Sequence, residues 1–123
     1  MRIWLLLASV NGLIAVLAGA YGWHSLAADE HDRQVFNLGV SYHMWHALAL
    51  FAVAWLASRR EGPPPLPVKL AGIAFTAGMV LFSGSLYALA MTGSAPVPYA
   101  APVGGVSFMA GWVALIWAAI RGR

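Results

Sequence analysis

The sequence predicts an all-α membrane protein, an antiparallel four-helix transmembrane bundle with short loops. The first observation is composition: 61% of the 123 residues are hydrophobic and only 9% are charged, whereas about a quarter of the residues in a soluble domain carry a charge. The second observation is a mean hydropathy of +0.74. The third is that long apolar segments alternate with short connectors that are polar or rich in proline.

Each predicted span has the length that a bilayer requires. A transmembrane helix needs about 20 mainly apolar residues, with a range of about 17 to 25. The segments that qualify form a single domain, 1–123, and are residues 3–23, 38–57, 68–91 and 103–120. Arg2 and the small residues at 18–20 also fit a signal peptide, but we expect the first segment to be a retained span.

The basic residues predict the orientation of the bundle. With four spans, both termini and the central connector share one side, which holds six of the seven basic residues: Arg2, Arg59, Arg60, Lys69, Arg121 and Arg123. The opposite side holds Arg33 and the acidic residues Asp29, Glu30 and Asp32, which we expect to help the second helix begin. Because basic loops stay in the cytoplasm, we expect a multi-pass protein of the bacterial inner membrane with cytoplasmic termini. The net charge of +3 therefore reflects topology, and no nucleic-acid partner is predicted.

Small residues at helical spacing predict the helix interfaces, because transmembrane helices associate where small side chains allow close approach. In the first span these residues are Ala8, Gly12, Ala15, Gly19 and Gly22. In the fourth they are Gly104, Ser107, Gly111, Ala114 and Ala118, and in the third they are Ala71, Ala74 and Gly78. We expect these seams to hold the bundle together in the lipid bilayer. Small-residue surface outside the seams would serve a homo-oligomer or a larger membrane complex.

The polar residues within the spans are the candidate functional residues, because ionisable groups in hydrocarbon are costly unless they are paired or hydrated. His43 and His46 are three residues apart and share a helix face. Gly39, seven residues before His46, leaves space for a neighbour, a water or a ligand. Tyr87 lies at a similar depth, and we predict that it hydrogen-bonds one of the two imidazoles. It ends a line of third-span residues spaced 4, 3 and 4, which begins with Thr76, Val80 and Ser83.

For each candidate, packing is the alternative to a ligand or proton-handling role, because polar side chains tie membrane helices together at about 0.6 kcal/mol per contact. The residues predicted to pack in this way are Asn11, Thr76, Ser83 and Ser85. His24 ends the first span on the same side as His43 and His46. It joins them only if the first helix loosens at Gly19 or Gly22.

Four motifs carry a resemblance to a known family over nearly the whole chain. They are "GAYGWHSL" at 19–26, "SYHMWHALAL" at 41–50, "LFSGSLYALAMTG" at 81–93 and "PVGGVSFMAGW" at 102–112. Together they are similar to the bacterial membrane family catalogued as domain of unknown function 423, small four-span proteins with distant mitochondrial transmembrane relatives. The resemblance implies an inner-membrane protein whose biochemical function is not established. It also implies a shared outer-leaflet site built from His24, His46, Tyr87 and a turn at 102–105, and family members often carry Gln at the position of His43.

Three classes of function fit these observations. The first is a non-catalytic accessory or assembly subunit, or a self-associating bundle, because the loops are too short to hold a soluble active site. The second is a small transporter, channel or proton-handling protein that uses the outer histidines and Tyr87. The third is a haem or metal binder that uses histidines of neighbouring helices. We expect no enzyme, no resident cofactor and no metal site, since the sequence has no nucleophile motif, phosphate loop or cysteine.

Overall fold

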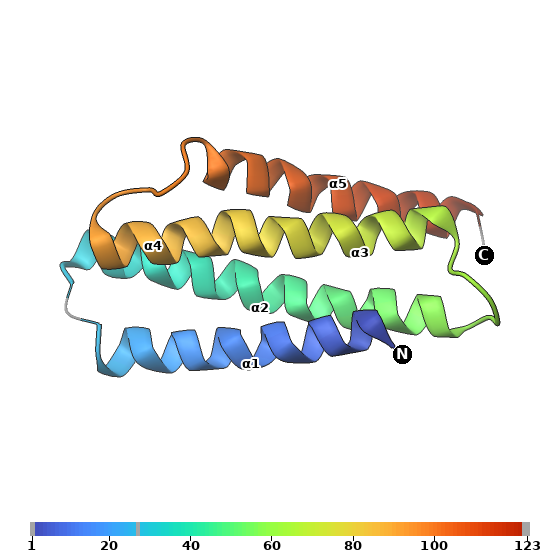
Figure 1. Ribbon diagram of the computed structural model, residues 1–123, viewed down its shortest axis with the longest axis horizontal. Coiled ribbons are helices and arrows are strands. Elements are labelled where there is room, and N and C mark those ends of the chain that lie inside the picture. Colours follow the sequence, from blue (N-terminus) through green and yellow to red (C-terminus); the bar gives the residue numbers. More distant parts are fainter. Residues whose placement is uncertain (1, 27, 122–123) are drawn as a thin grey trace.

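The computed structural model, which describes residues 2–26 and 28–121, shows the predicted bundle of four antiparallel helices joined by short loops (Figure 1). The first two spans are α1 (Ile3–His24) and α2 (Glu30–Ser58). The third span consists of α3 (Leu66–Gly78), a π-helical segment η1 (Met79–Ser83) and α4 (Gly84–Thr92), and the fourth is α5 (Ala100–Arg121). All four are long and apolar enough to cross a membrane. Arg123, one of the predicted basic residues, lies outside the described residues.

Helix α2 begins eight residues before the predicted span. The carboxylate of Asp29 accepts a hydrogen bond of 2.8 Å from the backbone N–H of Asp32, and this N-cap satisfies one of the unpaired donors of the first turn. Glu30 and Asp32 add negative charge at the same end. Hydropathy located the apolar part of α2, whereas the acidic cap determines where the helix starts.

The predicted turn at 102–105 is wrong, because these residues belong to the first two turns of α5. Pro102 is compatible with this position, since the first turn of a helix does not need the N–H that proline lacks. As a result, Gly104 lies on a helix surface that faces the third span and not in a loop above it.

The glycine seams are the helix interfaces, as predicted. Helix α1 packs chiefly on α2, and α5 packs chiefly on α3 and η1, so that α2 and the third span form the middle of the bundle (Figure 1). The contacts of α3 with α5 are reciprocal. A Cβ added at Gly78 would lie 2.4 Å from the ring of Phe108, and one added at Gly111 would lie 2.5 Å from the ring of Phe75. Each glycine therefore receives an aromatic ring from the facing helix.

The remaining predicted contact glycines differ in how closely a neighbour approaches them. A Cβ at Gly104 would lie 2.4 Å from the backbone nitrogen of Phe82, and a Cβ at Gly22 would lie 2.8 Å from the ring of Phe36. At Gly19 the nearest side-chain atom is at an ordinary 3.4 Å. The prediction for Gly12 is wrong, since no atom lies within 4 Å of a Cβ built there. The α1–α2 seam is therefore tight towards the C-terminal end of α1 and looser near Gly12.

The π-helical segment η1 changes the register of the third span. Val80, which the regular spacing places in line with Thr76 and Ser83, is 67% exposed, whereas Ser83 is fully buried. A π-helix takes more residues per turn than an α-helix, so the face presented by α4 is rotated relative to that of α3. The predicted line through Thr76, Val80, Ser83 and Tyr87 is therefore interrupted at Val80.

Candidate functional site

The two histidines of α2 lie at the centre of the polar contacts inside the bundle. His43 and His46 are separated by less than one helical turn, and they are 5% and 4% exposed. Each ring nitrogen of both imidazoles has a hydrogen-bond partner. The identity of those partners determines what each histidine can do.

His43 connects three helices through a chain of hydrogen bonds. Its Nδ1 lies 2.9 Å from the hydroxyl of Tyr87 on α4, and its Nε2 lies 2.9 Å from Oδ1 of Asn11 on α1. The amide of Asn11 donates to the carbonyl of Leu7 at 2.8 Å. A carbonyl can only accept, so the NH₂ group of Asn11 faces Leu7 and its oxygen faces the imidazole. Nε2 of His43 therefore carries a proton, and Tyr87 can donate to Nδ1.

His46 is held in the opposite tautomer. Its Nδ1 lies 2.7 Å from the carbonyl oxygen of Tyr42 one turn earlier, so Nδ1 donates. The indole N–H of Trp112 on α5 donates to Nε2 at 3.0 Å, so Nε2 must be unprotonated. The ring stacks on Phe108 with centroids 3.7 Å apart and planes 11° from parallel, and Phe75 packs against it at a centroid distance of 5.5 Å. This histidine belongs to the aromatic core between α2, α3 and α5.

The two sites have different chemical capacities. A proton added at Nε2 of His46 would point at the indole N–H of Trp112, which has no lone pair to accept it. A proton added at Nδ1 of His43 would point at the hydroxyl oxygen of Tyr87, which can accept as well as donate. The geometry around His43 thus fits either protonation state, whereas the geometry around His46 fits only the neutral imidazole.

The structure brings together only some of the candidate residues. The predicted tyrosine–imidazole hydrogen bond is present and uses His43. The shared site of His24, His46, Tyr87 and a turn at 102–105 is wrong as a grouping. Helix α1 stays regular through Gly19 and Gly22, and His24 is an exposed residue at its C-terminal end, outside the hydrogen bonds of the cluster.

Among the other polar candidates on the third span, Ser83 is the one that bonds a neighbouring helix. The hydroxyl of Ser83 donates to the carbonyl of Gly39 at 2.7 Å, and the ring of Tyr87 fills the space that Gly39 leaves, 3.1 Å from a Cβ built there. Ser85 is buried. Thr76 donates to the carbonyl of Gly72 in its own helix, so the prediction that it packs between helices through its hydroxyl is wrong.

Trp112 is the site residue that the sequence interpretation missed. Four of the six tryptophans fall near the ends of predicted spans, as interfacial tryptophans do, but Trp112 falls in the middle of α5. A buried tryptophan N–H usually has a hydrogen-bond partner, and for Trp112 this partner is His46. A position in the middle of a span was the available signal, but Trp45 on α2 shares it and is 55% exposed.

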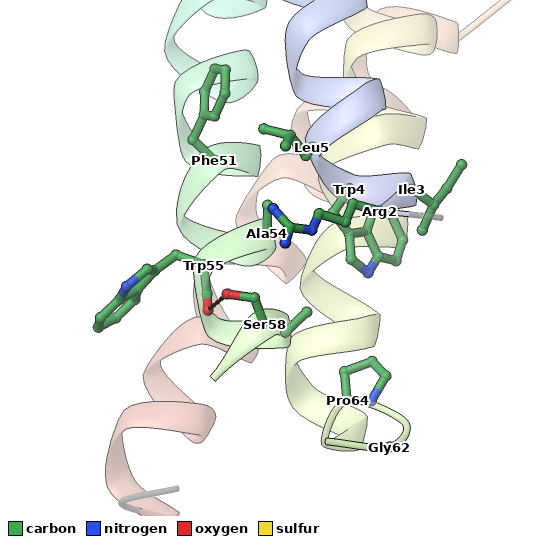
Figure 2. A pocket seen from close by; sticks show the side chains of 11 residues that line it. Arg2, Ile3, Trp4, Leu5, Phe51, Ala54, Trp55, Ser58, Gly62 and Pro64 are labelled. Carbon is green, nitrogen blue, oxygen red and sulfur yellow. Dashed lines mark hydrogen bonds between the residues drawn. The ribbon is translucent and has the colours of Figure 1, made fainter. Parts of the chain in front are cut away.

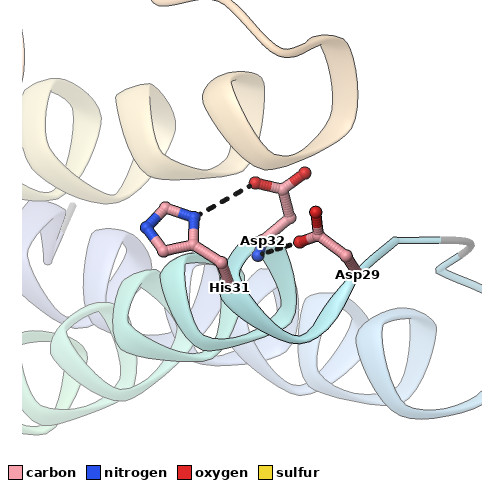
Figure 3. Close-up of polar contacts among 3 residues, drawn as sticks. All are labelled: Asp29, His31 and Asp32. Atoms are coloured by element: carbon pink, nitrogen blue, oxygen red, sulfur yellow. Dashed lines mark hydrogen bonds and ion pairs between the residues drawn. The ribbon is translucent and has the colours of Figure 1, made fainter.

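The end of the bundle with the acidic residues is organised by helix capping. Figure 3 shows Asp29, His31 and Asp32 grouped at the start of α2. One carboxylate oxygen or ring nitrogen from each residue, the kind of atom that could bind a metal ion, lies within 4.8 Å of the others. His31 lies 3.5 Å from the carboxylate of Asp32, and its side chain is 79% exposed. The N-cap role of Asp29 accounts for this arrangement.

Arg33 stabilises the connection between α1 and α2 through hydrogen bonds to backbone carbonyls. Its guanidinium donates to the carbonyls of Ala28 at 3.2 Å and Leu26 at 3.0 Å, and it reaches the carbonyl of Gly22 in the last turn of α1 at 3.5 Å. A cation at the C-terminal end of a helix pairs with carbonyls that have no partner in the helix and with the negative end of the helix dipole. The single basic residue at this end of the bundle therefore has a structural use.

Comparison with known proteins identifies a family of membrane proteins to which this chain is similar. The model of a family described as protein of unknown function (DUF423) matches residues 18–105. The UPF0382 membrane protein YwdK of Bacillus subtilis is 42% identical over 123 residues, covering 98% of both chains. The UPF0382 inner membrane protein YgdD of Escherichia coli is 35% identical over 122 residues, covering 98% of this chain and 91% of its own. No solved structure matches the chain. The resemblance carried by the four motifs is confirmed, and this small integral membrane protein belongs to the DUF423 family, whose full-length bacterial relatives are the UPF0382 membrane proteins.

Proposed function

We propose that this protein is a non-catalytic membrane subunit, either an accessory or assembly subunit of a larger membrane complex or a self-associating bundle. The observation that carries the proposal is that all four ring nitrogens of His43 and His46 already have hydrogen-bond partners, three of them on other helices of the bundle. Groups in this arrangement stabilise one packing of the helices. They would have to leave their partners before they could act on a substrate.

The outer surface of the bundle supports association in the plane of the membrane. On α1, Leu13 is 60% exposed and Leu17 is 59% exposed, and on α5 Val113 is 63% exposed. These two outer helices flank the middle of the bundle on opposite sides (Figure 1). A partner helix can therefore approach α1 and α5 independently.

Disulfide scanning tests self-association directly, because the chain has no cysteine of its own. Leu13→Cys on α1 and Val113→Cys on α5 each place one thiol on one outer face, so each variant is the matched control for the other. We expect oxidation in native membranes to crosslink copies through one face and not through both. Native mass spectrometry and co-purification from the same membranes would detect a different partner. A monomer without crosslinks and without a co-purifying protein would contradict the proposal.

The proposal includes no resident haem or metal. An iron or zinc ion needs an unshared imidazole nitrogen, and the nitrogens of His43 and His46 already have partners on α1, α2, α4 and α5. The visible absorption spectrum and the metal content of the protein purified from membranes test this. A Soret band, or one equivalent of a transition metal that is lost in His43→Gln, would contradict it.

The orientation of the protein is also proposed. Arg2, Arg59, Arg60, Lys69 and Arg121 lie at the end of the bundle that holds the termini, together with Glu61 as the acidic residue. This excess of positive charge supports cytoplasmic termini in a bacterial inner membrane. C-terminal fusions to a reporter active in the cytoplasm and to one active in the periplasm should give signal only with the first. The reverse result would invert the orientation.

Proton handling is a second candidate function, and the chain from Tyr87 through His43 to Asn11 favours it. The hydroxyl and the imidazole lie 2.9 Å apart, and both can donate or accept. Proton flux into proteoliposomes loaded with a pH-sensitive dye tests this candidate. Flux should be lost in His43→Gln and Tyr87→Phe but kept in Thr76→Val, whose hydroxyl bonds only its own helix. Flux equal to that of empty liposomes, or unchanged in His43→Gln, would reject it.

A further inference from the structure

A pocket of about 410 Å³ opens between the first turn of α1 and the last two turns of α2, beside the connector to α3 (Figure 2). Its walls are mostly apolar and include Trp4 and Leu5 from α1 and Phe51 and Ala54 from α2. The volume is within the range of about 300–1,000 Å³ that is usual for sites of small ligands. The pocket lies near the ends of two helices that are long and apolar enough to span a membrane, and the ends of spanning helices lie where hydrocarbon meets headgroups.

The packing of α1 explains why this space is open. The ring of Trp4 leaves the α1–α2 seam and lies against α3, where a Cβ added at Gly72 would be 2.6 Å from it. On α2 the facing residues are small, Ala54 and Ala57. Where Trp4 crosses to α3, the short side chains of Ala54 and Ala57 leave a gap that Phe51 and Trp55 border but do not fill.

One cation lies at the mouth of the apolar space. In Figure 2, the side chain of Arg2 extends from the start of α1 towards Ala54, so that its guanidinium lies between the two helices. The ion pairs found among the described residues do not include Arg2. Arg59 adds a second positive charge next to the pocket, with its guanidinium 4.7 Å from the ring centroid of Trp55, a lining residue. A guanidinium binds a phosphate through a fork of N–H donors.

We propose that this pocket binds one anionic phospholipid, with an acyl chain against Leu5, Phe51 and Ala54 and the phosphate on Arg2. The apolar walls match a hydrocarbon chain, the arginine matches a phosphate, and the pocket lies where a lipid places the junction of the two. The hydroxyl of Ser58 already donates to the carbonyl of Trp55 at 2.8 Å, so Arg2 is the lining group that provides the headgroup contact. The excess of basic residues at this end of the bundle favours an anionic headgroup over a zwitterionic one.

Competition between two lipids tests the site. The full-length protein, purified in mild detergent, is mixed with equal amounts of phosphatidylglycerol and phosphatidylcholine that have the same acyl chains, and bound lipid is counted by native mass spectrometry. We expect one lipid per chain and a preference for phosphatidylglycerol of about fivefold, the factor for one basic residue near an anionic lipid. Arg2→Gln should remove most of this preference. Lys69→Gln is the matched control, since it removes one charge from the same end of the bundle but from a residue that does not line the pocket.

A pocket-filling variant and a labelling experiment make the test independent of headgroup. Ala54→Leu should release the bound lipid whatever its headgroup, and thermal unfolding in detergent verifies that the variant is folded. Phosphatidylglycerol with a photoreactive acyl chain, incorporated into vesicles with the wild-type protein, should label residues 3–5 and 51–57. Absence of a retained lipid, equal losses in Arg2→Gln and Lys69→Gln, or labelling spread along all four helices would overturn the proposal. A dimer in the same spectra that Ala54→Leu dissociates would place a second copy of the chain at the pocket, and this result would also overturn the proposal.

Discussion

His43 and His46 lie within one turn of each other on α2 and are equally buried, but their imidazoles have hydrogen-bond partners of different kinds. His46 is stacked on Phe108 and accepts a hydrogen bond from the indole N–H of Trp112, which can only donate. His43 contacts a hydroxyl that can reverse its role and an amide oxygen that cannot. The comparison teaches that burial alone does not define the role of a membrane histidine. The donor or acceptor character of its partners does.

The difference also divides the bundle into two parts. The α5 side of α2 is an aromatic core in which His46 is one flat ring among several. The α1 and α4 side is a narrow polar path that runs from Tyr87 through His43 to Asn11. A substitution should therefore be able to disturb one part and leave the other intact, and this separation can be tested.

The largest effect is expected from a substitution on α5 that disturbs only the packing around His46. In Gly104→Ala, the new Cβ would lie 2.4 Å from the backbone nitrogen of Phe82, so α5 must move away from η1 and carry Phe108 and Trp112 with it. Overpacking of this kind costs about 1–3 kcal/mol, and backbone against backbone leaves little room to relax. The free energy of unfolding, measured by SDS titration in mixed micelles, should fall by an amount in the upper part of that range.

Gly105→Ala is the matched control for this prediction. Its new Cβ would lie 3.9 Å from the nearest atom, in the ring of Phe82, so the same change one residue later should alter the free energy of unfolding by less than about 0.5 kcal/mol. Equal destabilisation by the two variants would mean that the α5 seam is not the close contact seen here.

The next largest effect is expected from a substitution of His43, on the side of α2 that faces α1 and α4. His43→Leu removes two interhelical hydrogen bonds at about 0.6 kcal/mol each and should therefore destabilise the bundle by about 1–2 kcal/mol. His43→Gln has an amide that can donate to Asn11 and accept from Tyr87, so it should recover most of the loss in the same SDS titration. If Gln destabilised as much as Leu, the two hydrogen bonds would not be what His43 contributes.

Sequence reasoning reached the fold because each of its arguments depends on local chemistry. Span length, small-residue spacing and the acidic start of α2 are properties of single segments, and they placed the four helices and the seams through Gly78, Gly104 and Gly111 correctly. The error at Gly12 has the same origin. A stripe shows that close approach is allowed, but only the facing helix decides whether it occurs.

The grouping of site residues needed information that one segment does not contain. The π-helical turn at η1 alters which face α4 presents, and nothing in "MVLFS" distinguishes it from a regular turn. Tyr87 therefore reaches His43 and not His46. The pairing of His46 with Trp112 joins residues 66 positions apart, so it depends on the register between α2 and α5. His24 remained outside because α1 did not loosen at its glycines.

Smaller changes sharpen the comparison by removing one hydrogen bond from each histidine. Trp112→Phe keeps an aromatic ring but removes the N–H that occupies Nε2 of His46, and one interhelical hydrogen bond is worth about 0.6 kcal/mol. Tyr87→Phe is the counterpart on the other side, where it removes one bond from His43. Both variants should lower the free energy of unfolding by similar small amounts. The double variant should show the sum, because the two bonds share no partner. Strong coupling between them would show that the two sides of α2 are one network.

The last prediction concerns the wild-type protein and asks which ring nitrogen carries the proton in His43 and in His46. Because Asn11 accepts from Nε2 of His43 and Tyr42 accepts from Nδ1 of His46, nitrogen-15 spectra of labelled histidine at neutral pH should show opposite tautomers at the two positions. His43→Gln and His46→Gln assign the signals, and the exposed His24 and His31 serve as internal references for imidazoles in water. Trp112→Phe should alter the His46 signal and leave the His43 signal in place. Identical tautomers at the two positions would contradict the orientation of Asn11 or the Trp112 contact, and with it the separation of α2 into a fixed side and a reversible side.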